Sequence, residues 1–541
     1  MMAQMQSVGW RDWWSWNEES FFEIAILDGP RTGGDGAFTG GTSDSFVERL
    51  ILPPLREQAA DGSRRVVHAA ALEALGRTVR HGHSIEELAS QLDSSHAAVR
   101  QNAVIGLGLT GQQEAAMLLS RRASDGRYGD RECALALGSL AQCGIESENA
   151  DVRRFVANSL ASYVKPEKGV PVFGSIAATG LAVIAESHNV VSSDDERLFR
   201  RTLTWLSNDD LDYRLRAYVP RVVGSFAKDA ARANIVLDAL LKANKSEKRA
   251  EVRLAIVDAL GRLPLDEEAA PKAIKALTEA AKSGSQEAKR IALLGLGRRA
   301  AHPGGEAAQK YLHRQAKRPT GWKGPWIALA FGLWGHEQVE MGETPSVDRL
   351  RGMRVAMRKS ANPDIAVTWA LALGLSQDAE AAKVIGEAYS ESSHANLGLY
   401  AIALGMCGGV ERLDALRQDS KKHEHDAPLL EDLVIARALL GDQQLAKDLA
   451  LEMDEACCDQ SAAAYARALA RVPDRRVAGL LAERLAQPKA SDYVRAWSAM
   501  ALGRLADDTA SSWTSAWRSG FAWPAKDGLF SSTDKTGFLD R

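Results

Sequence analysis

The sequence predicts an all-α protein, a right-handed α-solenoid (α-α superhelix) of stacked two-helix repeats. Two observations predict it: an apolar stripe with helical spacing, and the return of that stripe in one register along the chain. The clearest copy runs from Glu251 to Leu263, where apolar residues fall at i, i+3, i+4, i+7, i+8 and i+11. Gly261 stands at i+9. Since glycine costs a helix up to about 1 kcal/mol, we expect it to serve close approach of a neighbouring helix.

We call this stripe with its following small residue the repeat phrase. Further copies of the phrase keep its main positions i, i+4 and i+8, followed by a small residue at i+9. They begin at Val67, Val99, Val152, Leu215, Ala288, Ile365, Asn396 and Val494. Their typical spacing of roughly 30 to 40 residues is that of two-helix solenoid repeats. A single copy is not specific, but many copies in one register are. No convincing run of alternating apolar and polar residues indicates a strand.

The copies resemble HEAT repeats, in particular the short bacterial kind also called lyase-like HEAT repeats. The likeness rests on an acid-Val-Arg start, as at Glu251, and an Ala-Leu-Gly end, as at Gly261. It covers the chain from about Asp44 to Asp507. The resemblance implies a fold and little chemistry, because one fold hosts many functions.

Three segments are predicted: residues 1–43 as a Trp-rich N-terminal cap and Gly-rich linker, 44–507 as the solenoid, and 508–541 as an aromatic C-terminal cap and flexible tail. Within the solenoid, Pro220 falls inside a second helix and is expected to kink it. The linker, from Gly29 to Asp44, lacks the Gly-Lys-Ser/Thr ending of a phosphate-binding loop.

The leader at residues 10–27 is unusually rich in tryptophan, with Trp10, Trp13, Trp14 and Trp16 close together. We expect it to cap the exposed face of the first repeat, which a solenoid requires. The alternative is a docking site for a partner or a membrane surface. The leader is also similar to that of exported bacterial HEAT proteins, through Trp13, Trp14, Asn17, Phe21 and Phe22, and this likeness implies an envelope location.

Composition excludes several classes of function. The formal net charge of the 541 residues is −3, so nothing global attracts nucleic acid or an anionic membrane. The five cysteines are scattered without zinc-like spacing or a disulfide framework. The start lacks a secretory signal, and no apolar run has the roughly 20 residues of a transmembrane helix. A cytoplasmic location is expected as the sequence is written; an upstream signal peptide absent from it would instead give an exported protein.

Deoxyhypusine hydroxylase is a HEAT-like enzyme family in which His-Glu pairs at helix starts hold two iron ions. The two pairs here, at His336 and His423, are out of that register. The tract from His423 to Asp426 has zinc- or nickel-type ligands but is expected to be solvated. The phycobilin lyases share the repeat type and no further motif. We therefore expect no metal, no cofactor and no catalytic residue.

A basic segment stands out between residues 289 and 359. Its candidate anion- or partner-binding residues are Arg298, Arg299, Lys310, Arg314, Lys317, Arg318, Lys323, Arg349, Arg351, Arg354 and Arg358, with Tyr311, Trp322 and Trp326 interleaved. Cations beside aromatic rings suit nucleic acid or another polyanion. The alternative is a solvated face with charges that complement helix ends.

The sequence thus predicts a non-catalytic scaffold, a monomer that presents an extended surface to a protein or peptide. The alternative is a polyanion- or nucleic-acid-binding solenoid that uses the basic segment, and a HEAT-like metalloenzyme or lyase comes third.

Overall fold

The computed structural model describes residues 9–22, 43–78, 85–166, 171–188, 193–317, 321–456, 458–472, 474–506 and Trp517. The described residues form helices and turns and contain no β-strand, so the all-α prediction is confirmed. They fall into two compact units. One comprises residues 1–21, 157–409 and 514–541, and the other comprises residues 22–156 and 410–513.

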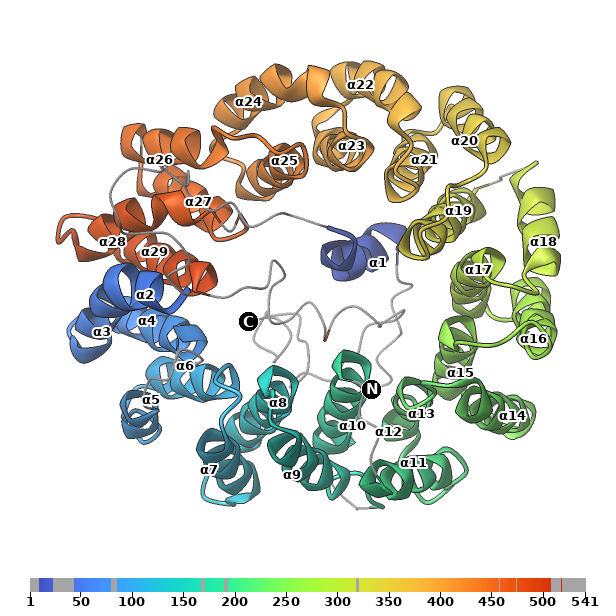
Figure 1. Ribbon diagram of the computed structural model, residues 1–541, viewed down its shortest axis with the longest axis horizontal. Helices are drawn as coiled ribbons and strands as arrows, with labels where there is room; N and C mark the ends of the chain where they lie inside the picture. The colour runs from blue at the N-terminus through green and yellow to red at the C-terminus, as the bar shows by residue number, and fades with distance from the viewer. Residues whose placement is uncertain are drawn as a thin grey trace, which may run out of the picture. The chain divides into compact units, whose positions relative to one another are not determined.

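The first unit is a double layer of helices (Figure 1). The second helices of its repeats are α10 (Pro171–Ser187), α13 (Val219–Ser225), α15 (Ala250–Arg262), α17 (Gln286–Ala301), α19 (Lys323–Glu340), α21 (Pro363–Leu375) and α23 (His394–Cys407). Its first helices are α11 (Ser193–Leu206), α14 (Ala230–Ser246), α16 (Ala270–Ser283), α18 (Glu306–Ala316), α20 (Val347–Lys359) and α22 (Ala382–Glu391), the last preceded by η4 (Ala379–Ala381). Each second helix packs on the next, which is the contact pattern of an α-solenoid.

The second unit has the same two layers. Its second helices are α4 (Arg65–Thr78), α6 (Ala97–Gly108), α8 (Asp130–Glu146), α25 (Ala427–Leu439), α27 (Asp459–Leu469) and α29 (Asp492–Leu505). Its first helices are α3 (Leu52–Ala60), α5 (Glu86–Ser90), α7 (Gln113–Ser124), α24 (Leu413–Lys422), α26 (Leu445–Glu455) and α28 (Ala478–Ala486). Short helices α2 (Ser43–Phe46), η2 (Val47–Ile51), η5 (Val410–Arg412) and η6 (Arg475–Val477) precede α3, α24 and α28, and α9 (Ala150–Ala161) spans the boundary between the units.

Glycine sets the spacing between second helices, as the repeated phrase predicts. A methyl group added at Gly261 would lie 2.5 Å from the Cα of Gly295 on the next second helix, and one at Gly108 would lie 2.7 Å from the carbonyl oxygen of Ser139. Gly76 and Gly297 approach the backbone of their neighbours still more closely. Only a residue without Cβ permits such contact, so the glycine of the repeat phrase allows neighbouring second helices to pack closely.

Two details of the predicted register are wrong. The helix that packs on α6 is α8, whereas the copy that begins at Val152 forms α9, the following helix. Pro220 does not kink a continuous helix: α12 (Tyr213–Arg216) ends before it, and α13 begins at Val219 with the proline in its first turn. Proline is well tolerated there because those N–H groups have no partner within the helix.

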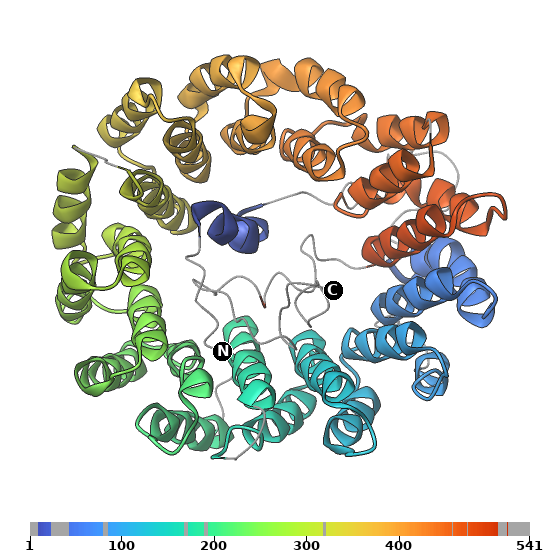
Figure 2. The same ribbon diagram turned by 180° about the vertical axis from the view of Figure 1, so that it is seen from behind.

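The last repeat packs on the first within the second unit. Helix α29 lies against α4, and a Cβ at Gly503 would be 2.7 Å from the Cα of Ala74 (Figures 1 and 2). Arg64 pairs with Asp492 at 2.9 Å, and the buried Arg495 donates to Gln58 Oε1 at 2.5 Å. The first repeat therefore has a helical neighbour on the side that a cap would otherwise cover.

Candidate interaction surfaces

The aromatic leader forms helix α1 (Trp10–Asn17), followed by η1 (Glu18–Phe21). Both belong to the first unit, where the leader contacts α19, α21 and α23. Trp10, Trp13 and Trp14 are buried, with Trp13 and Trp14 only 1 % exposed, and Trp16 is half-buried. The cap prediction for these tryptophans is therefore corrected in its location: the leader packs on the middle of the chain, while α29 covers the first repeat.

Arg11 anchors the leader at the N-terminal ends of two helices. Its Nη2 donates to Asp364 Oδ1 at 2.7 Å and to Asn396 Oδ1 at 2.5 Å, and its Nη1 donates to the Ala395 carbonyl at 3.3 Å. Asp364 lies in the first turn of α21, and Ala395 and Asn396 lie in the first turn of α23. The guanidinium also lies 4.7 Å from the Trp10 ring. A planar donor group thus meets three oxygens, an arrangement that suits arginine better than lysine.

Phe21, the last residue of η1, contacts both the leader and α19. Its ring stacks on Trp14 with centroids 5.9 Å apart and meets the His336 ring of α19 edge-on at 5.0 Å. Figures 1 and 2 draw α1 beside α19 in both views. We name the face formed by α19, α21 and α23 under the leader the leader surface. No sequence signal indicated it, because its contacts with the leader span more than 300 residues.

The basic segment divides into engaged and exposed cations. Arg299 is 1 % exposed and donates to the carbonyls of Leu263 and Leu265, so it ties two repeats together. Arg354 pairs with Asp378 at 3.1 Å and with Glu380 at 2.6 Å. These two side chains are structural and do not belong to an open anion-binding face.

Arg298 and Arg349 are also engaged. Arg298 reaches Glu337 at 3.5 Å, and Arg349 donates to Gln338 Oε1 at 2.5 Å while lying 4.2 Å from the Trp334 ring. Burial, followed by the charge of Arg262, lowers the pKa of Arg298 to about 10, and burial lowers the pKa of Arg349 to about 10. Both remain cationic at neutral pH, but they face protein rather than solvent.

The exposed cations lie on two first helices and the loop after α18. Lys310, Arg314 and Lys317 belong to α18 and its C-cap, whereas Arg351 and Arg358 belong to α20. Lys323 is half-buried, 5.7 Å from the Trp322 ring, and Arg318 lies outside the described residues. Tyr311 and Trp326 are buried, so neither offers a free ring face for base stacking. The sequence identified the charges correctly but not which of them reach solvent.

A charged row in the first unit was not predicted. Arg221 grips Glu186 with two hydrogen bonds, of 3.1 and 2.7 Å, and Glu337 lies between Arg298 and His302, the latter at 3.4 Å. Burial alone would raise the pKa of Glu337, but the hydrogen bond with His302 and the charge of Arg298 outweigh it and lower that pKa. The first pair joins the end of α10 to the first turn of α13, and the second joins the end of α17 to α19, so both tie neighbouring second helices together.

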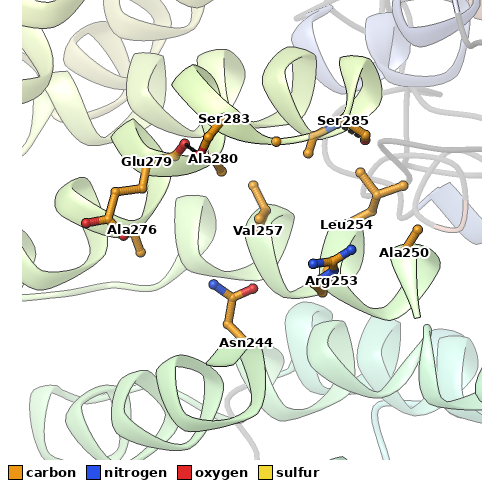
Figure 3. A pocket seen from close by; sticks show the side chains of 12 residues that line it. Asn244, Ala250, Arg253, Leu254, Val257, Ala276, Glu279, Ala280, Ser283 and Ser285 are labelled. Atoms are coloured by element: carbon orange, nitrogen blue, oxygen red, sulfur yellow. Dashed lines mark hydrogen bonds between the residues drawn. The ribbon is translucent and has the colours of Figure 1, made fainter. Parts of the chain in front are cut away.

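A pocket of about 300 Å³ opens between α14, α15, α16 and α17. Small residues create it: Ala250, Ala276, Ala280, Gly284 and Ala288 line its walls, together with Leu254 and Val257 (Figure 3). Arg253 is exposed at this pocket, and no ion pair or side-chain hydrogen bond engages it within the described part of the chain. The lining mixes polar and apolar groups and includes no catalytic arrangement.

The histidine motifs are dispersed. His336 contacts Phe21, and its neighbour Glu337 is engaged by Arg298 and His302. His425 Nδ1 lies 2.7 Å from Ser461 Oγ. Among the described residues, no three His, Cys, Asp or Glu side chains are grouped to hold a metal ion, and no helix is long and apolar enough to span a membrane.

The two layers of helices and the buried ties between repeats define an α-solenoid repeat protein. Residues 52–138 match the family model of HEAT repeats, which agrees with the resemblance seen in the sequence. A solved engineered protein is 16% identical, with a TM-score of 0.32, and the match covers 72% of this chain and 98% of that one. No curated protein matches this chain.

Proposed function

We propose that the chain is a non-catalytic scaffold that binds another protein through the second-helix layer of its solenoid. One observation carries the proposal: this layer of the first unit already holds a helix that is not part of the repeat array, α1, by contacts made through the side chains of the leader. An amphipathic helix docks through side-chain anchors on one face, and Arg11 and Phe21 supply such anchors here.

The test is affinity capture of partners with two layer-specific variants. Arg253 and Glu340 are exposed on second helices, whereas Lys275 and Asp348 are exposed on first helices. The variant Arg253→Glu/Glu340→Lys is expected to lose a partner captured by the wild type, as measured by quantitative mass spectrometry. The control Lys275→Glu/Asp348→Lys carries the same charge changes and is expected to keep it. Equal capture by both variants, or no reproducible partner, contradicts the proposal.

Polyanion binding is the second candidate, and the exposed cations of α18 and α20 favour it. Reversal of Lys310, Arg314 and Lys317 to Glu is expected to weaken the binding of duplex DNA or heparin at low salt. The slope of log K against log salt is expected to fall by roughly 0.9 for each lost DNA phosphate contact. Reversal of Lys272, Lys275 and Lys282 on α16, all exposed, is the control. Absence of binding by the wild type at low salt eliminates this candidate.

A further inference from the structure

Side-chain contacts hold the leader on the leader surface, as they would hold a bound peptide. We propose that the leader surface is a docking site for a short amphipathic helix of a partner protein. This helix carries an arginine followed two and three residues later by aromatic residues, and it displaces α1 from the surface. This inference rests on the proposed function and names the place and the partner chemistry. The pattern is that of Arg11, Trp13 and Trp14 in the leader itself.

The cation end of the surface is built for recognition. Asn396 is only 5 % exposed, and its side-chain oxygen accepts from the guanidinium of Arg11. Asp364 adds a carboxylate in the first turn of α21, where the helix dipole stabilises negative charge. A partner without a cation at this position leaves the carboxylate and the amide oxygen without this donor, so the site discriminates for arginine.

The aromatic end supplies the buried area. Trp13 and Trp14 are almost fully buried, and Phe21 fills the space between Trp14 and His336. Aromatic side chains carry most of the energy of helix docking because they bury a large apolar area with few rotatable bonds. The contact between Phe21 and His336 therefore favours an occupant that carries an aromatic ring over a wholly aliphatic one.

Three features make α1 a weak occupant. The indole Nε1 atoms of Trp13 and Trp14 are buried without a hydrogen-bond partner among the described residues, and a buried donor without an acceptor is destabilising. The Arg11–Asp364 pair is 42 % and 51 % exposed, and solvent weakens an exposed ion pair. A helix of 8 residues has little stability of its own.

Covalent attachment compensates for these weaknesses. A tethered ligand competes at an effective concentration that a free partner lacks, so weak contacts suffice to keep it in place. A partner helix with phenylalanine at the two indole positions avoids both unsatisfied donors. As a free peptide, such a helix is expected to bind the surface more tightly than the leader sequence does.

The test uses the full chain and a fluorescein-labelled peptide of residues 9–22, followed by fluorescence anisotropy. The variant Arg11→Ala/Trp14→Ala weakens the resident leader and is expected to bind the peptide at least tenfold more tightly than the wild type does. Adding Asp364→Lys is expected to weaken peptide binding about tenfold, whereas adding Asp348→Lys on the exposed face of α20 leaves it unchanged. A peptide with Trp13→Phe and Trp14→Phe is expected to bind more tightly than the parent peptide.

Equal binding by the wild type and the leader-weakened variant, or no effect of Asp364→Lys, overturns the proposal. Asp364 is half exposed, so its substitution is expected to spare the fold, and unchanged helical circular dichroism verifies this. Concentration-dependent dimerisation of the wild type that Asp364→Lys abolishes would instead show a second copy as the occupant. Because the assay contains no partner protein, its outcome is independent of the capture experiment.

Discussion

At the scale of single residues, the glycines at position i+9 of the repeat phrase determine how closely neighbouring second helices approach. Gly261 faces the backbone of Gly295, whereas Gly352 on α20 has no atom within 4 Å of an added Cβ. Gly261→Ala is therefore expected to destabilise the protein by about 1–3 kcal/mol, because the helices must separate. Gly352→Ala is expected to stabilise it by up to about 1 kcal/mol, because alanine is the better helix former. Urea denaturation of the two variants measures the difference, and equal effects would refute the packing role.

The same scale shows where sequence reasoning stops. The role of Gly261 was predictable, because it follows an apolar stripe that fixes its position relative to the core. The burial of Arg299 was not predictable, because its acceptors are carbonyls 36 and 34 residues earlier in the chain. Charge alone cannot tell a solvated arginine from one that ties two repeats together, and the basic segment contains both kinds.

At the scale of elements, a buried ion network joins α24, α25 and α26. Asp442 accepts from Arg417 at 2.6 Å and from Arg437 at 2.9 Å, and Arg437 also reaches Asp448 at 2.7 Å. The side chains of Asp442 and Arg437 are both 0% exposed. Removal of one member leaves a buried charge uncompensated. Asp442→Ala is therefore expected to cost about 3–5 kcal/mol of local stability, measured by hydrogen exchange in α25.

Asp414 supplies the control for this network. It pairs with the same Arg417 at 3.1 Å, but its side chain is 87% exposed, so Asp414→Ala is expected to cost less than about 1 kcal/mol. A cost for Asp442→Ala no larger than that for Asp414→Ala would contradict the buried-network account.

The network also predicts a response to acid. Burial alone would raise the pKa of Asp442, but the hydrogen bond from Arg417 and the charge of Arg437 outweigh it and lower that pKa below 3.8. A lowered pKa in the folded state gives stability that is present above the unfolded value and is lost as pH falls through the folded value. The stability difference between wild type and Asp442→Ala is therefore expected to shrink below about pH 4. Denaturation curves at neutral and acidic pH test this, and a difference that stays constant would refute it.

At the scale of elements, the surface that the leader contacts could not be predicted from the sequence. The sequence predicted that the leader's tryptophans cap the first repeat, whereas the structure places Trp10, Trp13 and Trp14 in a buried helix beside α19 (Figure 1). What the sequence lacked was the partner surface, since Asp364, Asn396 and His336 are ordinary members of their own helices. A docking partner on the same chain becomes visible only when the repeats are stacked.

At the scale of the whole molecule, the contact between α29 and α4 joins the two separate stretches of the second unit. In other solenoids the terminal repeats fray, because each has a neighbour on one side only. Here Gly503 meets Ala74, two residues before the phrase glycine Gly76, just as Gly261 meets Gly295, two residues before Gly297. The last second helix thus uses the first one as its next neighbour in the same register.

This register predicts long-range coupling between the ends of the helical array. Gly503→Leu forces side-chain atoms toward the backbone of α4, so hydrogen-exchange protection in residues 65–78 is expected to fall although the substitution lies more than 400 residues away. Gly479→Leu places the same side chain on α28, where nothing lies within 4 Å of the added Cβ, and is expected to leave α4 protected. If α4 keeps full protection in Gly503→Leu, the two ends are not coupled in solution. If α4 loses protection, the repeat phrase specifies the contact between first and last helices as well as the contacts between successive ones, because a single glycine position serves both.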